Sequence, residues 1–350
     1  MDGERVPTSA DTPSNRRAES PIRARWLTIQ KLCTHPRNLY GQVAFVRTTR
    51  VARIDEDLPV VGQGTWHMGE RPETRTREAD ALRLGVELGM TVIDTAEYYA
   101  AGRAELVVAD ALRDIRAQVF LVDKIFPHHP TLEGTRRAAR AALRRTGAGY
   151  FDLLLIHWPT PLFRVHLMAL SMIYAEGVAR YIGVSNFDQA WLVRAGPGLP
   201  SDTPVTANQL PYNLGDRRLE LEFLNELQAR GILVMAYSPL GRGRLLRGRR
   251  LTVLSGVARE VGVTPSQVAL AWTVRHPGVV AIPKAVDPSH VRDNAAAAEV
   301  VFTPEQLARL DAAFPVGVKP YQPDLPAWQS VFRWAYQWEE RRMRRGPPVG

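Results

Sequence analysis

Residues 92–96 (VIDTA), 119–124 (VFLVDK) and 152–158 (DLLLIHW) are short apolar runs that decide how this chain of 350 residues folds. Each run is rich in aliphatic or β-branched side chains and shows little alternation of polar and apolar positions, which is typical of strands buried on both faces. Such strands belong to parallel sheets covered by helices. Runs of the same kind recur at 59–64, 180–184, 204–208, 232–237 and 279–283.

Helical segments fall between most of these runs. Residues 78–89 (EADALRLGVELG) carry apolar side chains at helical spacing and end at a glycine that can cap a helix. Residues 264–277 (TPSQVALAWTVRHP) place Thr264 at an N-cap, Pro265 in the first turn and Gln267 at the capping-box position. Eight strands alternating with helices predict an α/β fold, the closed (β/α)8 TIM barrel.

A dinucleotide-binding Rossmann fold is not expected. Residues 62–66 (GQGTW) lie at the end of the first predicted strand, but they lack the third glycine of a G-x-G-x-x-G turn that opens a helix. The closed barrel is therefore favoured over an open, doubly wound sheet.

The chain is predicted to have three parts. Residues 1–46 are rich in Pro, Ser, Thr and Arg without a sustained period, so we expect a flexible, disordered basic extension. Residues 47–315 form the barrel. Residues 316–350 carry three tryptophans, and we expect this tail to pack back as a helix.

Charge, cysteine content and the length of apolar runs narrow the functional classes. The formal net charge is +9, of which residues 1–50 contribute +5 and residues 316–350 contribute +3. The middle of the chain is nearly neutral, so nucleic-acid binding is not expected. The single cysteine, Cys33, excludes an intrachain disulfide and favours a reducing, cytoplasmic location. Apolar runs stay far below the ~20 residues of a membrane span, and we expect a monomer or weak dimer.

Four residues near the ends of predicted strands form a set suited to reducing a carbonyl group. Asp94, Lys124 and His157 lie where (β/α)8 barrels gather their catalytic residues, and Tyr99 follows on a loop. Tyr99 is the candidate donor of the proton that the carbonyl oxygen needs. We expect the Lys124 ammonium to lower the phenol pKa, Asp94 to anchor Lys124, and His157 to hydrogen-bond the substrate oxygen.

Each of these residues also has a purely structural interpretation. Asp94 could cap a helix, Tyr99 could be a core aromatic residue, and His157 could be a satisfied polar residue at a strand end. Only the complete set favours catalysis.

Eight colinear stretches resemble the aldo-keto reductase family, over about residues 47–315. The likeness is closest to bacterial members that reduce methylglyoxal and other small aldehydes. The resemblance implies a (β/α)8 barrel that binds NADPH in an extended form, reduces small aldehydes and ketones to alcohols, and uses the four residues above as its catalytic tetrad. The stretches are VGQGTWHMGE (61–70), VIDTAEYYAAGRAELVVADAL (92–112), VFLVDKIFP (119–127), DLLLIHWP (152–159), RYIGVSNFD (180–188), NQLPYNLGDR (208–217), MAYSPLGRG (235–243) and AIPKAVDPSHVRDNAA (281–296).

The resemblance also implies a set of cofactor-binding residues. Ser185, Asn186 and Gln209 match the residues that hold the nicotinamide carboxamide, and Tyr237 matches the aromatic residue stacked on that ring. Thr65 is expected to bind the cofactor as well. The pyrophosphate turn and the adenosine end complete the set with Ser238, Leu240, Gly241, Lys284, His290 and Asn294.

Three positions depart from the family pattern at the adenosine end. His290 lies where an arginine commonly holds the 2′-phosphate, Ala285 lies where serine is frequent, and Asp293 replaces a glutamate. Loss of a bidentate arginine weakens phosphate selection. We expect NADPH because Lys284 is present, with NADH as the alternative.

The substrate side is predicted from aromatic residues. Trp66, Phe126 and Trp158 are expected to line a compact pocket for a small carbonyl compound. Residues 162–177 (LFRVHLMALSMIYAEG) are unusually apolar for an outer helix of a barrel. This feature keeps a second hypothesis open, a regulatory protein of the same fold that binds cofactor and a partner without turnover.

The adjacent pair His128 and His129 raises the question of a metal ion. The neighbouring sequence offers neither an acidic residue nor a cysteine at ligand spacing, so we expect loop histidines at a pocket mouth and no metal site. The isolated pair Cys33 and His35 is interpreted in the same way.

Overall fold

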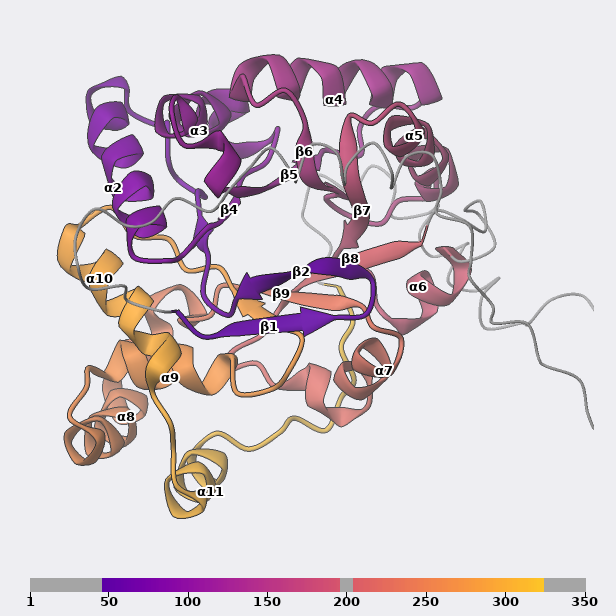
Figure 1. Ribbon diagram of the computed structural model, residues 1–350. Helices are drawn as coiled ribbons and strands as arrows, with labels where there is room; N and C mark the ends of the chain where they lie inside the picture. The colour runs from indigo at the N-terminus through magenta and orange to yellow at the C-terminus, as the bar shows by residue number, and fades with distance from the viewer. Residues whose placement is uncertain (1–45, 196–203, 324–350) are drawn as a thin grey trace, which may run out of the picture. The chain divides into compact units, whose positions relative to one another are not determined.

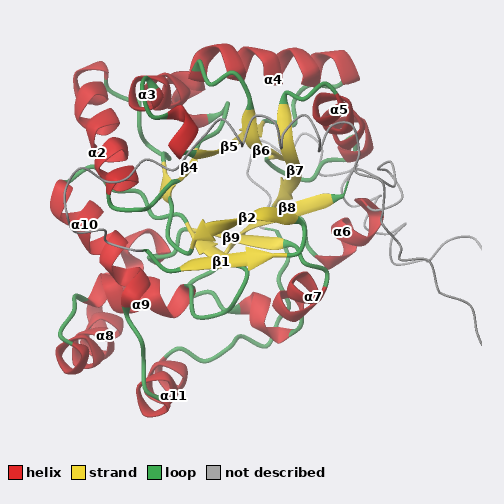
Figure 2. Cartoon of the chain, viewed as in Figure 1, coloured by secondary structure: helices red, strands yellow, loops and turns green. Residues whose placement is uncertain are grey.

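The computed structural model describes residues 46–195 and 204–323 of the chain (Figure 1). Within these residues, eight parallel strands form one sheet that helices surround, as Figure 2 shows. The strands of this sheet are β3 (Gln63–Gly64), β4 (Val92–Asp94), β5 (Phe120–Ile125), β6 (Phe151–Ile156), β7 (Ala179–Ser185), β8 (Val205–Pro211), β9 (Leu233–Tyr237) and β10 (Val279–Ala281). The helices are α2 (Arg75–Glu87), α3 (Arg103–Leu112), α4 (Leu132–Thr146), α5 (Phe163–Ala175), α6 (Gln189–Ala195), α7 (Phe223–Ala229), α8 (Gly248–Val261), α9 (Pro265–Thr273), α10 (Pro288–Ala296) and α11 (Pro304–Ala313).

The sheet closes on itself. Its strands pair in sequence order from β3 to β10, and Val61 then forms a parallel bridge with Ala281. The amide of Gly62 donates to the Ala281 carbonyl at 2.8 Å, and the Ala281 amide donates to the Val60 carbonyl at 2.9 Å. The predicted (β/α)8 barrel is therefore confirmed.

An antiparallel hairpin of β1 (Thr48–Val51) and β2 (Ile54–Pro59) precedes the barrel. Ile54 and Leu58 are buried in the cluster of side chains that fills the barrel interior. Arg53 donates to the carbonyl of Val205, where β8 begins, so the hairpin packs against the amino end of the barrel. The predicted strand at 59–64 is wrong in its bounds, because β2 ends at residue 59 and β3 is short.

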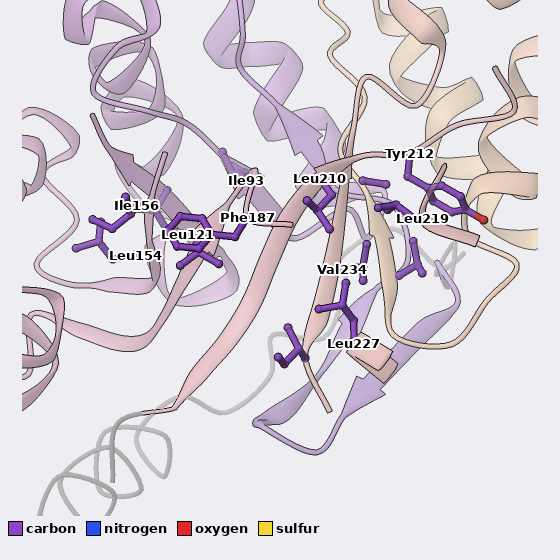
Figure 3. Close-up of a cluster of buried hydrophobic side chains, with 14 of the residues drawn as sticks. Ile93, Leu121, Leu154, Ile156, Phe187, Leu210, Tyr212, Leu219, Leu227 and Val234 are labelled. Carbon is purple, nitrogen blue, oxygen red and sulfur yellow. The ribbon is translucent and has the colours of Figure 1, made fainter. Parts of the chain in front are cut away.

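Both faces of the barrel strands are buried, as the apolar runs predicted. In β5, Leu121 belongs to the cluster that includes helix residues, whereas Val122 belongs to the cluster inside the barrel. Figure 3 shows part of the outer cluster, in which side chains from neighbouring strands lie together. Because the side chains inside the barrel and those between strands and helices are both apolar, polar groups gather at the ends of the strands.

Two of the predicted helix-capping signals are present in the structure. Thr264 and Gln267 form a capping box at the start of α9, and Gly89 follows α2 with a φ of 93°.

In α5 the side chains facing the barrel are buried, while Met168 and Met172 are 41% and 37% exposed. Most apolar side chains of α5 are therefore buried in the core, and two methionines are exposed on its outer face.

Most of the predicted terminal parts lie outside the described residues. This holds for residues 1–45 of the basic extension and for 324–350, where the helical tail was expected. The described residues 316–323 are not helical, and Tyr321 among them is buried. None of the described helices is long and apolar enough to cross a membrane.

Candidate active site

Parallel pairing brings the predicted catalytic residues to one end of the barrel. Asp94 is the last residue of β4, Lys124 is the penultimate residue of β5, and His157 directly follows β6. Tyr99 begins a 3₁₀ turn in the loop after β4. The carboxyl ends of neighbouring strands meet at this edge, so the four side chains gather there.

Asp94 and Lys124 form a buried ion pair. The Lys124 Nζ lies 2.7 Å from both carboxylate oxygens of Asp94 and donates also to the Thr95 carbonyl at 2.7 Å. Gln209 donates to Asp94 Oδ1 at 2.7 Å. Burial raises the pKa of Asp94 and lowers that of Lys124, and the attraction between the two charges opposes both shifts.

Tyr99 differs from expectation in the direction of its pKa shift. The Lys124 ammonium lies 4.9 Å from the centroid of the Tyr99 ring. Burial nevertheless raises the phenol pKa well above its ordinary value, and the Asp94 carboxylate adds to this shift. The net shift is therefore upward, opposite to the lowering expected from Lys124, because burial is its largest cause. The phenol stays protonated at neutral pH, which is the state that a proton donor requires.

The turn that carries Tyr99 has an unusual backbone. Ala100 and Ala101 have φ values of 50° and 55°, in the left-handed region, and Gly102 follows at 84°. A residue with a Cβ in this region costs roughly 1–2 kcal/mol. Strain of this kind concentrates at functional sites, where the surrounding structure imposes it.

His157 is held as a neutral imidazole beside Tyr99. The two ring centroids are 5.7 Å apart in an edge-on arrangement. Burial lowers the pKa of His157 well below its ordinary value, and the Lys124 charge adds to this shift. Its Nδ1 atom is buried without a hydrogen-bond partner among the described residues. A neutral imidazole at this position can donate one hydrogen bond to a substrate oxygen.

A second buried carboxyl pair lies behind the ion pair, and sequence reasoning missed it. Asp123 accepts from the Lys124 amide at 2.7 Å, and Glu105 binds Arg145, with one contact of 3.0 Å. Burial raises the pKa of Asp123 well above its ordinary value, and the nearby Glu105 adds to this shift. A carboxyl group inside the apolar run 119–124 was the visible signal.

The residues expected to hold the carboxamide lie together next to the tetrad. Ser185 Oγ donates to the Gln209 carbonyl at 3.0 Å. Asn186 has a φ of 63° and donates to the His157 carbonyl at 3.1 Å. The Tyr237 hydroxyl donates to Asn186 Oδ1 at 2.8 Å. These side chains form one polar cluster tied to the backbone of His157 and, through Gln209, to the carboxylate of the ion pair.

The remaining cofactor candidates lie around the same end of the barrel. Thr65 is fully buried, its amide donates to the Asp94 carbonyl at 3.0 Å, and its hydroxyl has no partner among the described residues. Asn294 is buried on α10, whereas Lys284 after β10 and His290 on α10 are exposed. Exposed cationic or titratable groups at one edge can meet a phosphate.

The turn after β9 differs in detail from the expected phosphate-binding turn. Ser238 and Gly241 have φ values of 51° and 57°. The Gly241 amide donates to the Ser238 carbonyl at 2.8 Å, and the Gly243 amide donates to the Leu240 carbonyl at 3.0 Å. Two of the turn's amides are thus used internally, so they do not offer N–H groups to a phosphate in this conformation.

The three aromatic residues expected to line the substrate pocket each follow the carboxyl end of a barrel strand. Trp66 is 40% exposed, and the Arg242 guanidinium lies 4.8 Å from a centroid of its indole. Phe126 stacks on Tyr98 at 4.5 Å, and its ring centroid lies 6.0 Å from that of His157. Trp158 is half-buried, with its ring 6.4 Å from that of His157. A cavity of about 270 Å³ lies beside Phe126, lined also by Glu97, Tyr98, Ala101, His128 and Arg145.

The paired histidines lie in the loop after β5, as expected, but an acidic side chain from another loop lies beside them. Glu97, from the loop after β4, comes close to His128 and His129, so an acidic partner is present after all. His129 Nε2 lies 3.0 Å from Glu97 Oε1. Sequence spacing could not show this contact, because the glutamate comes from a different loop.

The chain is similar in sequence and in structure to known proteins. The model of the aldo/keto reductase family matches residues 60–314. Methylglyoxal reductase YeaE of Escherichia coli (strain K12) is 43% identical over 264 residues, which cover 75% of this chain and 93% of that protein. The 9,11-endoperoxide prostaglandin H2 reductase of Trypanosoma cruzi (strain CL Brener) is 30% identical over 258 residues, which cover 73% of this chain and 87% of that protein. The crystal structure of an aldo/keto reductase from Klebsiella pneumoniae in complex with NADP and acetate has a TM-score of 0.74 at 39% identity, covering 81% of this chain and 100% of that one.

Proposed function

The chain belongs to the aldo/keto reductase family, and on that premise we propose that it reduces small aldehydes and ketones to alcohols with NADPH, with Tyr99 as the proton donor. The observation that carries the proposal is the buried Asp94–Lys124 pair with the Tyr99 ring 4.9 Å from the ammonium and the His157 ring edge-on to it. The relative YeaE is named a methylglyoxal reductase, which supports a small carbonyl substrate.

The residues fit a nicotinamide cofactor. The buried Thr65 hydroxyl lacks a partner among the described residues, which is costly unless a ligand or water satisfies it. Ser185, Asn186 and Gln209 together present the hydroxyl and amide groups that a carboxamide needs. Tyr237 lies in the same cluster and would cover one face of the ring. The solved relative from Klebsiella pneumoniae contains NADP, which supports the same assignment.

Bound NADPH supplies the hydride that adds to the carbonyl carbon. As negative charge develops on the carbonyl oxygen, Tyr99 Oη gives up its proton to that oxygen, and the product is the alcohol. The Lys124 ammonium stabilises the phenolate that forms, and Asp94 keeps the ammonium in place. His157, being neutral, donates a hydrogen bond to the same oxygen without carrying charge into the site.

Lys284 and His290 decide which dinucleotide is preferred. Both side chains are exposed at the edge formed by the end of β10 and by α10. We assign Lys284 to the 2′-phosphate of NADPH and expect measurable use of NADH, because His290 cannot offer the bidentate contacts of an arginine.

The test measures consumption of NADPH and of NADH with methylglyoxal and with a small aromatic aldehyde. Wild-type protein should turn over with NADPH, and Tyr99→Phe should lose most of kcat while quenching of tryptophan fluorescence shows unchanged NADPH binding. Wild-type turnover by Tyr99→Phe would remove Tyr99 as the donor. Tight cofactor binding by the wild type without turnover of either aldehyde would support the regulatory alternative.

A further inference from the structure

Glu97, His128 and His129 form a cluster outside the proposed catalytic groups. Glu97 lies in the loop after β4, and the two histidines lie in the loop after the neighbouring strand β5. The Glu97 amide donates to the Lys124 carbonyl at 3.1 Å, which ties the first loop to the end of β5. One potential ligand atom from each of the three side chains lies within 4.8 Å of the other two.

The surrounding structure orients these side chains. Glu97 Oε2 accepts a hydrogen bond from the Phe126 amide at 2.9 Å, which fixes the carboxylate. His166, fully buried on α5, lies with Nε2 2.9 Å from the His129 carbonyl, and it must be the donor because a carbonyl only accepts. Metal ligands are commonly held by such outer contacts.

One carboxylate and two imidazoles form a set of oxygen and nitrogen donors of the kind that binds zinc in proteins. Arg145 lines the adjacent cavity, yet it is paired with Glu105.

We propose that Glu97, His128 and His129 bind one zinc ion at the mouth of the barrel, with water completing its coordination. Tetrahedral zinc ligands at about 2.1 Å from the metal lie roughly 3.4 Å from one another. The distances from His129 Nε2 to the two Glu97 oxygens, 3.0 and 3.3 Å, are already close to this value. His128 is exposed, so its ring can rotate to complete the set.

On binding, the zinc ion would replace the hydrogen atom in the hydrogen bond between His129 Nε2 and the Glu97 carboxylate. Imidazole and carboxylate ligands favour zinc, copper or nickel over magnesium and calcium, which prefer oxygen alone. The site is distinct from the proposed catalytic groups, and zinc binding does not depend on reductase activity. It lies next to Phe126, whose ring is 5.3 Å from that of His128 and 6.0 Å from that of His157. An occupied site would therefore border the substrate side of the barrel.

The test uses the full-length chain without a histidine tag. Calorimetric titration with zinc chloride, checked by competition with a chromophoric zinc chelator, should give one zinc ion per chain. His128→Gln and Glu97→Gln should each weaken binding by at least the ~10–100-fold that loss of an outer contact costs. His67→Gln is the matched control, because His67 and Glu70 form another exposed pair that lacks a second histidine. Its zinc affinity should equal that of the wild type.

Magnesium should not compete with zinc, whereas copper should bind more tightly. Cobalt should give the intense visible absorption of a four-coordinate ion, a readout that owes nothing to turnover. Far-UV circular dichroism checks the fold of each variant, and the exposed His128→Gln decides the matter if Glu97→Gln misfolds. Absence of saturable binding below millimolar zinc, or equal affinity in wild type and His128→Gln, would overturn the proposal. Loss of affinity in His67→Gln alone would place the zinc elsewhere and overturn it as well.

Discussion

Replacing Lys124 by methionine should destabilise the protein as well as slow it. The sequence alone predicts a loss of rate with little effect on folding. In the structure, however, the side chains of Lys124 and Asp94 are 0% and 2% exposed, so the substitution strands a carboxylate away from water. Removing one partner of a buried pair costs about 3–5 kcal/mol. Gln209 remains as a single neutral donor to Asp94 and cannot replace the ammonium charge.

Urea unfolding followed by circular dichroism measures this cost. With a slope of roughly 3 kcal/mol per M, the midpoint of Lys124→Met should fall by about 1–1.7 M. The double variant with Asp94→Asn should recover most of the loss, because it removes the stranded charge. An unchanged midpoint in the single variant would refute the reasoning. Equal loss in single and double variants would assign the cost to packing instead of charge.

The loss of folding stability in Lys124→Met should also depend on pH. Without Lys124, the pKa of Asp94 in the folded state rises further above its unfolded value of about 3.9. A carboxyl group with a raised folded pKa favours the folded state below the unfolded pKa and loses that contribution as pH rises through the folded pKa. The deficit of Lys124→Met relative to the wild type should therefore be smallest near pH 4 and largest at neutral pH.

Two further predictions concern packing and pH. Gly183→Ala should destabilise the barrel by about 1–3 kcal/mol, because its new Cβ would lie 2.5 Å from a carbonyl oxygen of the next strand. Gly256→Ala on α8 meets no atom within 4 Å and should stabilise by about 0.5–1 kcal/mol; urea midpoints that move together would contradict this contrast. Burial lowers the pKa of His157 and raises that of Tyr99, so kcat/KM should show no His157 inflection near pH 6.5 and should lose activity only above about pH 10. An inflection near 6.5 that disappears in His157→Gln would refute the neutral assignment.

The barrel could be predicted because its strands are buried on both faces, which leaves continuous apolar runs in the sequence. The hairpin before the barrel was missed because the buried apolar residues Ile54 and Leu58 are separated by three consecutive acidic residues. This apolar pattern is too sparse to indicate a strand. The capping box at Thr264 was recognisable because its residues are local in sequence.

The site was predictable to the extent that it lies at strand ends. The sequence indicated the types and approximate positions of Asp94, Tyr99 and Lys124, but the balance between burial and charge on the Tyr99 phenol depends on three-dimensional distances. The contact between Glu97 and His129 joins residues 32 positions apart. Such a cluster has no spacing signature, because the strand pairing and the two loop conformations create it.

Closure of the barrel has a consequence for synthesis of the chain. The first barrel strand pairs with the last, and Arg47 donates to the Val274 carbonyl, 227 residues later. At translation rates of about 5–20 residues per second, roughly 10–45 s separate the two partners as they leave the ribosome. During that interval the growing sheet presents an unpaired edge, which invites association with other chains. The nascent protein is therefore most exposed to aggregation, and most in need of chaperones, just before β10 emerges.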